Sequence, residues 1–157
     1  MPMPCYLTIP EYPGSCVQEG HEDCIFVEAV QHNVSVPVDP HSGSKIGHRM
    51  HRPLRITKAI DKSSPGLFKA MTTGQTLEKI TLDFYRIDNT GVEENYYRIT
   101  LGDVHVVDVV LEVPNCAVPA NDALPHMEHV AFTYRTITWE HLIDSVVEMD
   151  EWYVQGD

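Results

Sequence analysis

The sequence predicts a mainly β protein: a closed or nearly closed antiparallel β-barrel of two sheets, with one short accessory α-helix and one long exposed loop. Two observations support this fold class. Segments that are rich in β-branched residues, or that alternate apolar and polar residues, recur along the chain between turn residues. Only one segment has the spacing and end signals of a helix, and strands are predicted on both sides of it.

The first half of the chain contains β-branched segments separated by a turn-rich stretch. Residues 25–27 and 34–38 are rich in isoleucine and valine, and Pro37 favours the end or edge of a strand because it cannot donate a ladder hydrogen bond. The stretch that follows contains several glycine, serine and aspartate residues, and it predicts a long exposed loop over Asp39–Arg52. Alternating residues in 54–58 then predict a strand.

A single short helix is predicted from about Ser64 to Thr73. Ser64 is expected to be the N-cap, Pro65 suits the first helical position, and Gly74 suits the C-terminal end. The apolar stripe expected to pack on the barrel consists of Leu67, Phe68 and Met71.

The chain returns to strands directly after this helix. Residues 80–85 alternate, and residues 88–91 (Asp-Asn-Thr-Gly) predict a hairpin turn. The remaining predicted strands are 96–101, 104–113, 130–135 and 137–139.

Composition predicts one globular domain over residues 1–157, since 43% of 157 residues are hydrophobic. A net charge of −12 argues against nucleic-acid binding, which needs a basic face. No run of about 18 apolar residues predicts a membrane helix, and residues 1–6 lack the features of a signal peptide. Because we therefore expect a reducing cytoplasm, four reduced thiols are predicted. They are Cys5, Cys16, Cys24 and Cys116.

Charge is unevenly distributed along the chain. Residues 45–69 carry seven basic residues and one acidic residue, Asp61, whereas residues 140–157 carry six acidic residues and no lysine or arginine. If these stretches lie on opposite faces, copies of the chain could stack head to tail. The alternative is that both stretches are ordinary solvated surface. The six acidic residues are Glu140, Asp144, Glu148, Asp150, Glu151 and Asp157.

Two histidine pairs are the only candidates for metal chemistry. His48 with His51, and His126 with His129, are each spaced i, i+3, which on a strand places the side chains on opposite faces and disfavours chelation. The sequence has no GxSxG, GxGxxG or Walker A motif. We therefore predict no catalytic, cofactor-binding or metal-ligating residues. A metal-dependent enzyme that uses the histidine pairs remains an alternative.

Several longer segments resemble one protein family almost from end to end. The most specific are Asp-Lys-Ser-Ser-Pro at 61–65 and Tyr-Arg-Thr-Ile-Thr-Trp at 134–139, with Gly-His-Arg-Met-His-Arg-Pro at 47–53 before them. In these segments the chain resembles haemolysin-coregulated protein (Hcp), the inner-tube subunit of type VI secretion systems. The loop over 14–22 is shorter than in many members of that family.

The resemblance implies a structural protein and not an enzyme. Hcp subunits form hexameric rings that stack into a tube, which a contractile sheath propels, behind a spike protein, into a target cell, with small effectors in the lumen. It implies a protein that stays in the bacterial cytoplasm before firing, needs no cofactor, is not embedded in a membrane and leaves through the apparatus. The alternative is a secreted effector chaperone or carrier that acts as free rings.

The resemblance also implies that the loop over 39–52 projects toward the next ring. Among its residues, Arg49, His51 and Arg52 are the strongest candidates for stacking contacts, with the acidic C-terminal residues as hypothetical partners. The full set of candidates is Asp39, Ser42, Lys45, His48, Arg49, His51 and Arg52.

Overall fold

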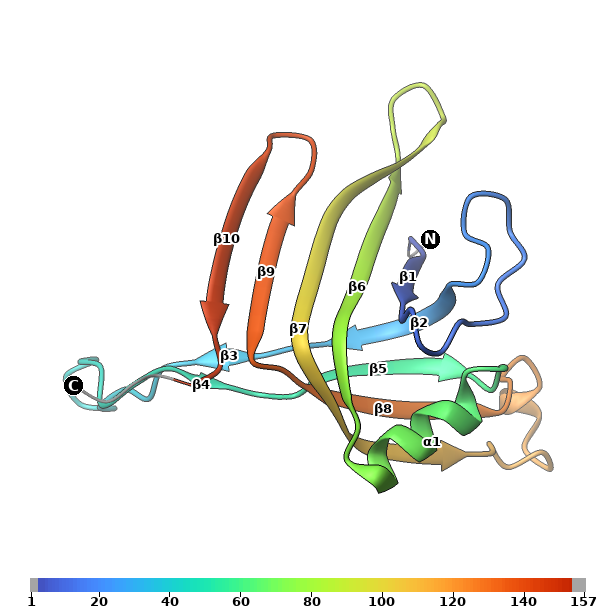
Figure 1. The fold of residues 1–157 in the computed structure, drawn as a ribbon, viewed down its shortest axis with the longest axis horizontal. Helices are drawn as coiled ribbons and strands as arrows, with labels where there is room; N and C mark the ends of the chain where they lie inside the picture. The colour runs from blue at the N-terminus through green and yellow to red at the C-terminus, as the bar shows by residue number, and fades with distance from the viewer. Residues whose placement is uncertain (1–2, 154–157) are drawn as a thin grey trace.

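A computed structural model describes residues 3–153, and these form ten strands, one α-helix and one 3-10 helix (Figure 1). Residues 1–2 and 154–157 of the predicted domain, among them Asp157, lie outside the described residues. The elements are β1 (Cys5–Thr8), β2 (Ile25–Gln31), β3 (Val34–Ser35), β4 (Met50–His51), β5 (Leu54–Ala59), α1 (Ser64–Thr73), β6 (Thr76–Ile87), β7 (Glu93–Glu112), η1 (Pro119–Asn121), β8 (Met127–Thr133), β9 (Thr136–His141) and β10 (Val146–Glu151).

Six antiparallel strands close a barrel, which confirms the predicted fold class. Their order is β7-β6-β1-β2-β5-β8, and β8 pairs with β7 to close the ring, while β9 and β10 extend the sheet outward from β7. Figure 1 shows two layers, with β6, β7, β9 and β10 upright and β2, β5 and β8 running across them. The layers are joined because β7 pairs with β6 and β9 in its first half and with β8 in its second half.

Strand β7 corrects one expectation, because the two predicted strands 96–101 and 104–113 form one strand of 20 residues, Glu93–Glu112, which ends one residue before 113. The chain bends between them without leaving the ladder. Asp103 has a φ of 50°, and a Cβ on Gly102 would lie 2.4 Å from Thr136 Oγ1. Glycine therefore allows the close approach of β9 at the bend. The sequence pattern predicts two separate strands at this point, but the backbone of β7 stays paired with its neighbouring strands on both sides of the bend.

Strand β10 was not predicted from the sequence. Residues 146–151 were treated as part of an acidic tail, yet they pair along their full length with β9. Both faces of β10 are largely exposed, so its side chains do not alternate between apolar and polar as those of a half-buried strand do. The predicted turn over 88–91 does join β6 to β7, and Gly91 takes a φ of 84° there.

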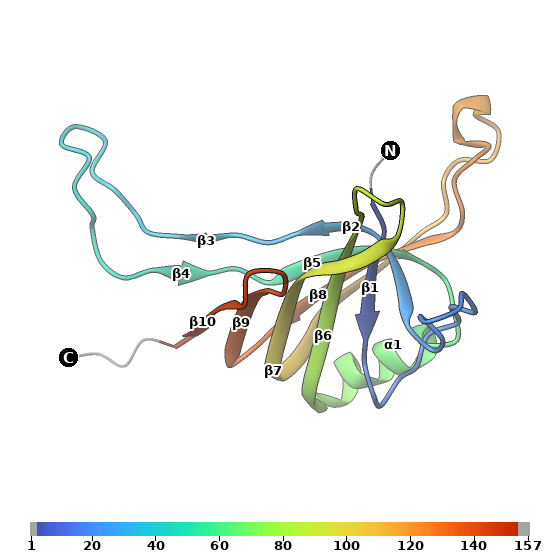
Figure 2. The same cartoon turned by 90° about the horizontal axis from the view of Figure 1, so that it is seen from above.

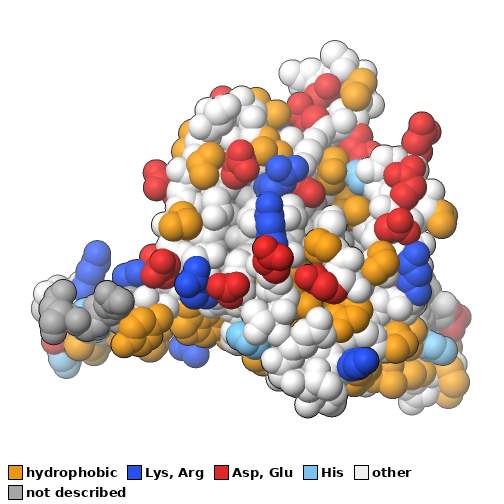
Figure 3. All heavy atoms as spheres, viewed as in Figure 1, with side chains coloured by type: hydrophobic (Ala, Val, Ile, Leu, Met, Phe, Trp, Pro, Cys, Tyr) orange, Lys and Arg blue, Asp and Glu red, His pale blue; other side chains and the backbone are white. Residues whose placement is uncertain are grey.

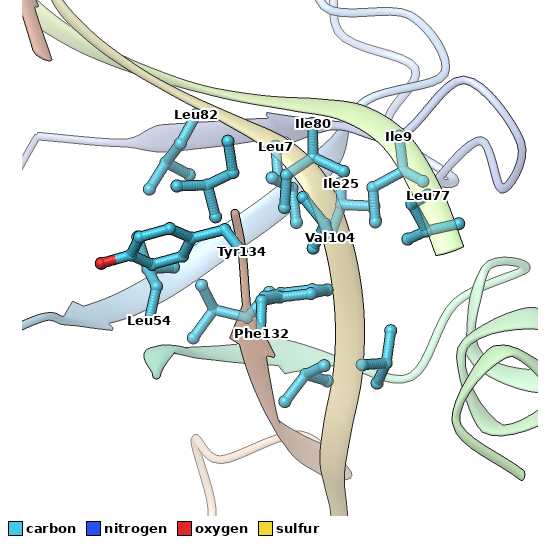
Figure 4. Close-up of a cluster of buried hydrophobic side chains, with 14 of the residues drawn as sticks. Leu7, Ile9, Ile25, Leu54, Leu77, Ile80, Leu82, Val104, Phe132 and Tyr134 are labelled. Atoms are coloured by element: carbon cyan, nitrogen blue, oxygen red, sulfur yellow. The ribbon is translucent and has the colours of Figure 1, made fainter. Parts of the chain in front are cut away.

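The core lies between the two layers of the barrel. Figure 4 shows aliphatic side chains from β1, β2 and β6 meeting aromatic side chains from the end of β8. Leu7 and Phe132 are fully buried, and Tyr134 is 4% exposed. Burial of this continuous apolar cluster is the main stabilising contribution to the fold.

Helix α1 has the predicted bounds, but its cap and its buried face differ from the prediction. The N-cap is Ser63 and not Ser64, whereas Gly74 ends the helix with a φ of 69° as predicted. Leu67 is fully buried, and Met71 packs against the core. The prediction for Phe68 was wrong: it is 36% exposed because i and i+1 diverge by about 100° around a helix. The buried position completing this face is Ala70.

A buried ionic cluster connects the start of α1 to the barrel. Lys58 of β5 is fully buried, and its Nζ lies 3.2 Å from Glu128 Oε1 and 3.1 Å from Asp61 Oδ1. The Ser64 hydroxyl accepts a hydrogen bond from Lys58 Nζ at 3.1 Å and donates one to Glu128. The Ser64 side chain is therefore part of this cluster.

Candidate assembly surface: the arm and its base

The chain between β2 and β5 forms a long two-stranded arm that projects away from the barrel (Figure 2). We call residues 32–52 the arm. It contains the pair β3–β4, with Val34 opposite His51, and an isolated bridge between Val38 and Lys45 nearer the tip. The predicted loop is thus the outer part of a longer hairpin-like segment, and β4 lies within its predicted bounds.

Two of the predicted stacking residues shape the turn at the tip of the arm. The Asp39 carboxylate accepts a hydrogen bond from the backbone N–H of His41 at 2.8 Å, and the Ser42 hydroxyl accepts one from Ser44 N–H at 3.2 Å. Gly43 supplies the left-handed conformation of this turn, with a φ of 73°. Asp39 and Ser42 therefore have an internal structural role in this chain.

Two other candidates bind the body of the same chain. Arg49 makes a bidentate ion pair with Asp150 of β10, with Nε 2.5 Å from Oδ2 and a second nitrogen 2.6 Å from Oδ1. His51, whose side chain is fully buried, lies with Nε2 2.7 Å from the same carboxylate. A planar guanidinium on a carboxylate is a strong and directional contact. The base of the arm is thus held against β10.

Aromatic side chains complete the base. His51 Nδ1 lies 2.7 Å from the Tyr134 hydroxyl, which lies 2.8 Å from His32 Nε2, and Trp152 stacks on the His51 ring at 5.8 Å. Because the Asp150 carboxylate only accepts, His51 donates to it from Nε2. The Tyr134 hydroxyl lies within hydrogen-bond distance of both His51 Nδ1 and His32 Nε2. This chain of hydrogen bonds satisfies the buried polar groups on both strands of the arm.

The charge of Asp150 is stabilised at neutral pH. Burial alone would raise the pKa of this carboxyl, but the hydrogen bonds from Arg49 and His51 outweigh it, and the pKa lies below its ordinary value. A lowered folded-state pKa contributes stability at neutral pH that is lost as pH falls through that value. Burial, with the nearby His51, also lowers the pKa of His32 and favours its neutral form.

Replacement of Asp150 by asparagine is expected to loosen the arm at its base. The amide removes the charge that pairs with Arg49 and leaves the buried His51 with a weaker acceptor. Hydrogen–deuterium exchange should show protection of residues 49–51 falling by about tenfold. Glu148→Gln is the matched control, because Glu148 is an exposed β10 residue with no ion pair among residues 3–153. Equal protection of residues 49–51 in both variants would contradict the conclusion that Asp150 holds the base of the arm.

The other basic residues in the predicted loop form no such contacts with residues 3–153. Lys45, His48 and Arg52 are exposed, and neither Lys45 nor Arg52 forms an ion pair with another described residue. Figure 3 shows lysine and arginine side chains along the arm, whereas acidic side chains are spread over the visible face of the barrel. Exposed Glu148 and Glu151 also form no ion pair within residues 3–153.

The two histidine pairs do not form joint sites. His48 is exposed while His51 is buried in the base of the arm. His126 is exposed, whereas His129 binds Thr57 at 3.0 Å and Glu112 at 2.6 Å through its two ring nitrogens. Within residues 3–153, no group of three or more histidine, cysteine, aspartate or glutamate residues has the geometry to hold a metal ion.

Comparison with known proteins identifies the family. The model of the type VI secretion system effector Hcp matches residues 6–141. The chain belongs to the Hcp family. It is 42% identical over 139 residues to the "Major exported protein" of Pseudomonas aeruginosa, covering 88% of this chain and 81% of that protein. The sequence resemblance to Hcp is thereby confirmed.

Solved Hcp structures share the fold. A crystal structure of an Hcp protein superposes with a TM-score of 0.86 at 28% identity, covering 97% of this chain and 99% of the other. Secreted Hcp3 from P. aeruginosa gives 0.77 at 31% identity, covering 97% and 99%. The chain thus shares both the sequence and the fold of the type VI secretion protein family Hcp. In the described part of the chain, the helices are too short or too polar to cross a membrane.

Proposed function

We propose that this chain is the inner-tube subunit of a type VI secretion apparatus. Six copies form a ring, rings stack head to tail inside a contractile sheath behind a spike protein, and the tube carries small effectors in its lumen. The protein waits in the bacterial cytoplasm, needs no signal peptide for export and performs no catalysis. Membership of the Hcp family supports this role.

The arm is the observation that carries the stacking part of the proposal. An isolated two-stranded segment is only marginally stable in water. The arm therefore depends on the contacts at its base to hold its position. Arg49 and His51 hold it to β10, while Lys45 and Arg52 remain exposed without ion pairs among the described residues. An anchored projection with free cations suits a contact with a different, acidic surface of the next copy.

We propose residues other than Arg49 and His51 for that contact. Arg49 and His51 were expected to reach the neighbouring ring, but both bind Asp150 of their own chain. Lys45 and Arg52 therefore become the stacking residues of this proposal. The exposed carboxylates Glu148 and Glu151, which have no ion pair within residues 3–153, are the proposed partners.

Light scattering with negative-stain imaging tests the ring. We expect a mass six times the 17.8 kDa of the chain and annular particles. At low salt, where screening is weakest, the rings should lengthen into stacks. Arg52→Glu should keep the ring and reduce stacking, while Lys69→Glu, on the exposed face of α1, should change neither. A monomer at every concentration would contradict the proposal, and rings that never stack would favour a free-ring carrier.

A further inference from the structure

Cys16 and Cys24 lie opposite each other where the chain enters β2. The backbone N–H of Cys16 donates to the carbonyl of Cys24 at 3.2 Å, and the carbonyl of Cys16 accepts from Asp23 N–H at 3.1 Å. Asp23 has a φ of 62°, as the first residue of a β-bulge with a left-handed position does. Asp23 and Cys24 on one segment therefore both lie opposite Cys16 on the other.

This pairing sets a backbone separation that suits a disulfide. Directly opposed residues in an antiparallel pair have Cα atoms roughly 4.5–5.5 Å apart. Disulfides in proteins span Cα separations of roughly 4.4–6.8 Å. Gly14 makes the approach possible, because a Cβ on it would lie 2.3 Å from the carbonyl oxygen of Cys24. We therefore expect a bond between the two sulfur atoms to require side-chain rotation but no rearrangement of the backbone.

Both thiols lie near the same aromatic side chain. Cys24 Sγ lies 3.5 Å from Thr8 Oγ1, on the face of β1 that also carries Tyr6. The pKa of Tyr6 is raised to about 12, mainly by burial, with smaller contributions from nearby groups that include Glu93, Cys16 and Cys24. Both cysteines are therefore near Tyr6, which the loop between them covers.

The other two cysteines are poor alternatives. Cys5 is buried, and burial raises the pKa of its thiol to about 12, so little of the reactive thiolate forms at neutral pH. Cys116 is exposed in the segment between β7 and β8, which projects from the barrel on the side away from the arm (Figure 2). Cys16 and Cys24 are both partly exposed, so a soluble oxidant can reach them.

We infer that Cys16 and Cys24 are a disulfide site that is reduced in the cytoplasm that makes the protein and closes after export into an oxidising compartment. The inference uses the exported character of the family and does not depend on ring stacking. One thiolate attacks glutathione disulfide and releases one glutathione. The second thiolate then attacks the mixed disulfide and releases another, so the protein loses two hydrogens and the oxidant gains two electrons.

Closing this bond would stabilise one end of the barrel. The closed segment contains Gln18, which accepts a hydrogen bond from the Tyr6 hydroxyl at 2.8 Å, and His21, which stacks on the Tyr6 ring at 3.9 Å. His21 also lies 3.0 Å from Glu93 at the start of β7. A covalent link from Cys16 to Cys24 would lower the conformational entropy of this segment in the unfolded state. Folding of the segment, and with it the formation of all three contacts, would then cost less entropy.

Oxidation of the purified protein tests the site. After incubation with glutathione disulfide, alkylation and mass spectrometry should show two of the four cysteines protected and a peptide that joins Cys16 to Cys24. The melting temperature should rise by about 5–10 °C and return to its initial value with dithiothreitol. Cys24→Ser should abolish both changes, and Cys116→Ser should preserve them.

Two results would overturn the inference. One is alkylation of both Cys16 and Cys24 after oxidation, with Cys116 alone forming mixed disulfides or dimers. The other is a Cys16–Cys24 link that leaves the melting temperature unchanged or lowers it, since this would mean that the reduced loop does not already have a compatible geometry. A failure of either kind says nothing about rings, and a monomer in light scattering says nothing about the disulfide.

Discussion

Replacement of Lys58 by methionine is expected to destabilise the protein by about 3–5 kcal/mol, the usual cost of removing one partner from a buried ion pair. Lys58 is fully buried and is the cation between Glu128, which is 1% exposed, and Asp61. Glu128 Oε2 has no hydrogen-bond partner in the described part of the chain, so its charge depends strongly on Lys58. Urea denaturation followed by far-UV circular dichroism measures the difference.

A double variant separates the loss of charge balance from the loss of packing. Adding Glu128→Gln to Lys58→Met removes the uncompensated carboxylate, and part of the lost stability should return. Lys62→Met is the matched surface control. The Lys62 side chain is 54% exposed and pairs with an exposed Asp23. The Lys62→Met substitution should therefore lower the free energy of unfolding by less than about 1 kcal/mol. A double variant no more stable than Lys58→Met would contradict the role of Lys58 as the counterion.

Leu67→Asp is expected to have a comparable or larger effect, because it places a charge on the fully buried face of α1. The truncation Leu67→Ala alone should cost about 2–5 kcal/mol, and a buried carboxylate adds a desolvation penalty. In thermal denaturation of the purified variants, Leu67→Asp should either show no cooperative transition, because it is already unfolded, or melt at a much lower temperature than the unmodified protein. Leu67→Ala keeps the comparison measurable if the aspartate variant does not fold.

The neighbouring residue provides a strict control for that prediction. Phe68 is 36% exposed, so Phe68→Asp should change the free energy of unfolding by no more than about 1 kcal/mol. The two variants introduce the same charge at adjacent positions of one helix. Similar losses in both would show that α1 packs with a different face toward the barrel.

Much of the fold could be predicted because it is encoded locally. The bounds of α1 follow from a proline near its start, a periodic apolar face and a glycine after its end, all within one short segment. The same holds for β5, where residues alternate, and for the turn over 88–91, where Gly91 supplies a left-handed conformation. The order of these elements, with strands on both sides of one helix, then predicted a barrel, which the structure confirms.

Pairing of distant segments is what local patterns failed to indicate. Strand β10 has two exposed faces, and only its hydrogen bonds to β9 make it a strand. Strand β7 continues through Asp103 because it changes partners there from β6 and β9 to β8. Nothing in either segment specifies those partners by itself, since ladder hydrogen bonds depend on which backbone lies alongside.

The sequence by itself determined the fold class, the helix, the main turns, the basic stretch over 45–69 and the acidic C-terminal segment. The tertiary structure decided the role of each charge. It paired Arg49 and His51 with Asp150 of the same chain, buried Lys58 beside Glu128 and left Arg52 exposed. The physical reason is that the energy of a charge depends on burial and on its nearest counterion. Both are properties of residues brought together from distant parts of the chain.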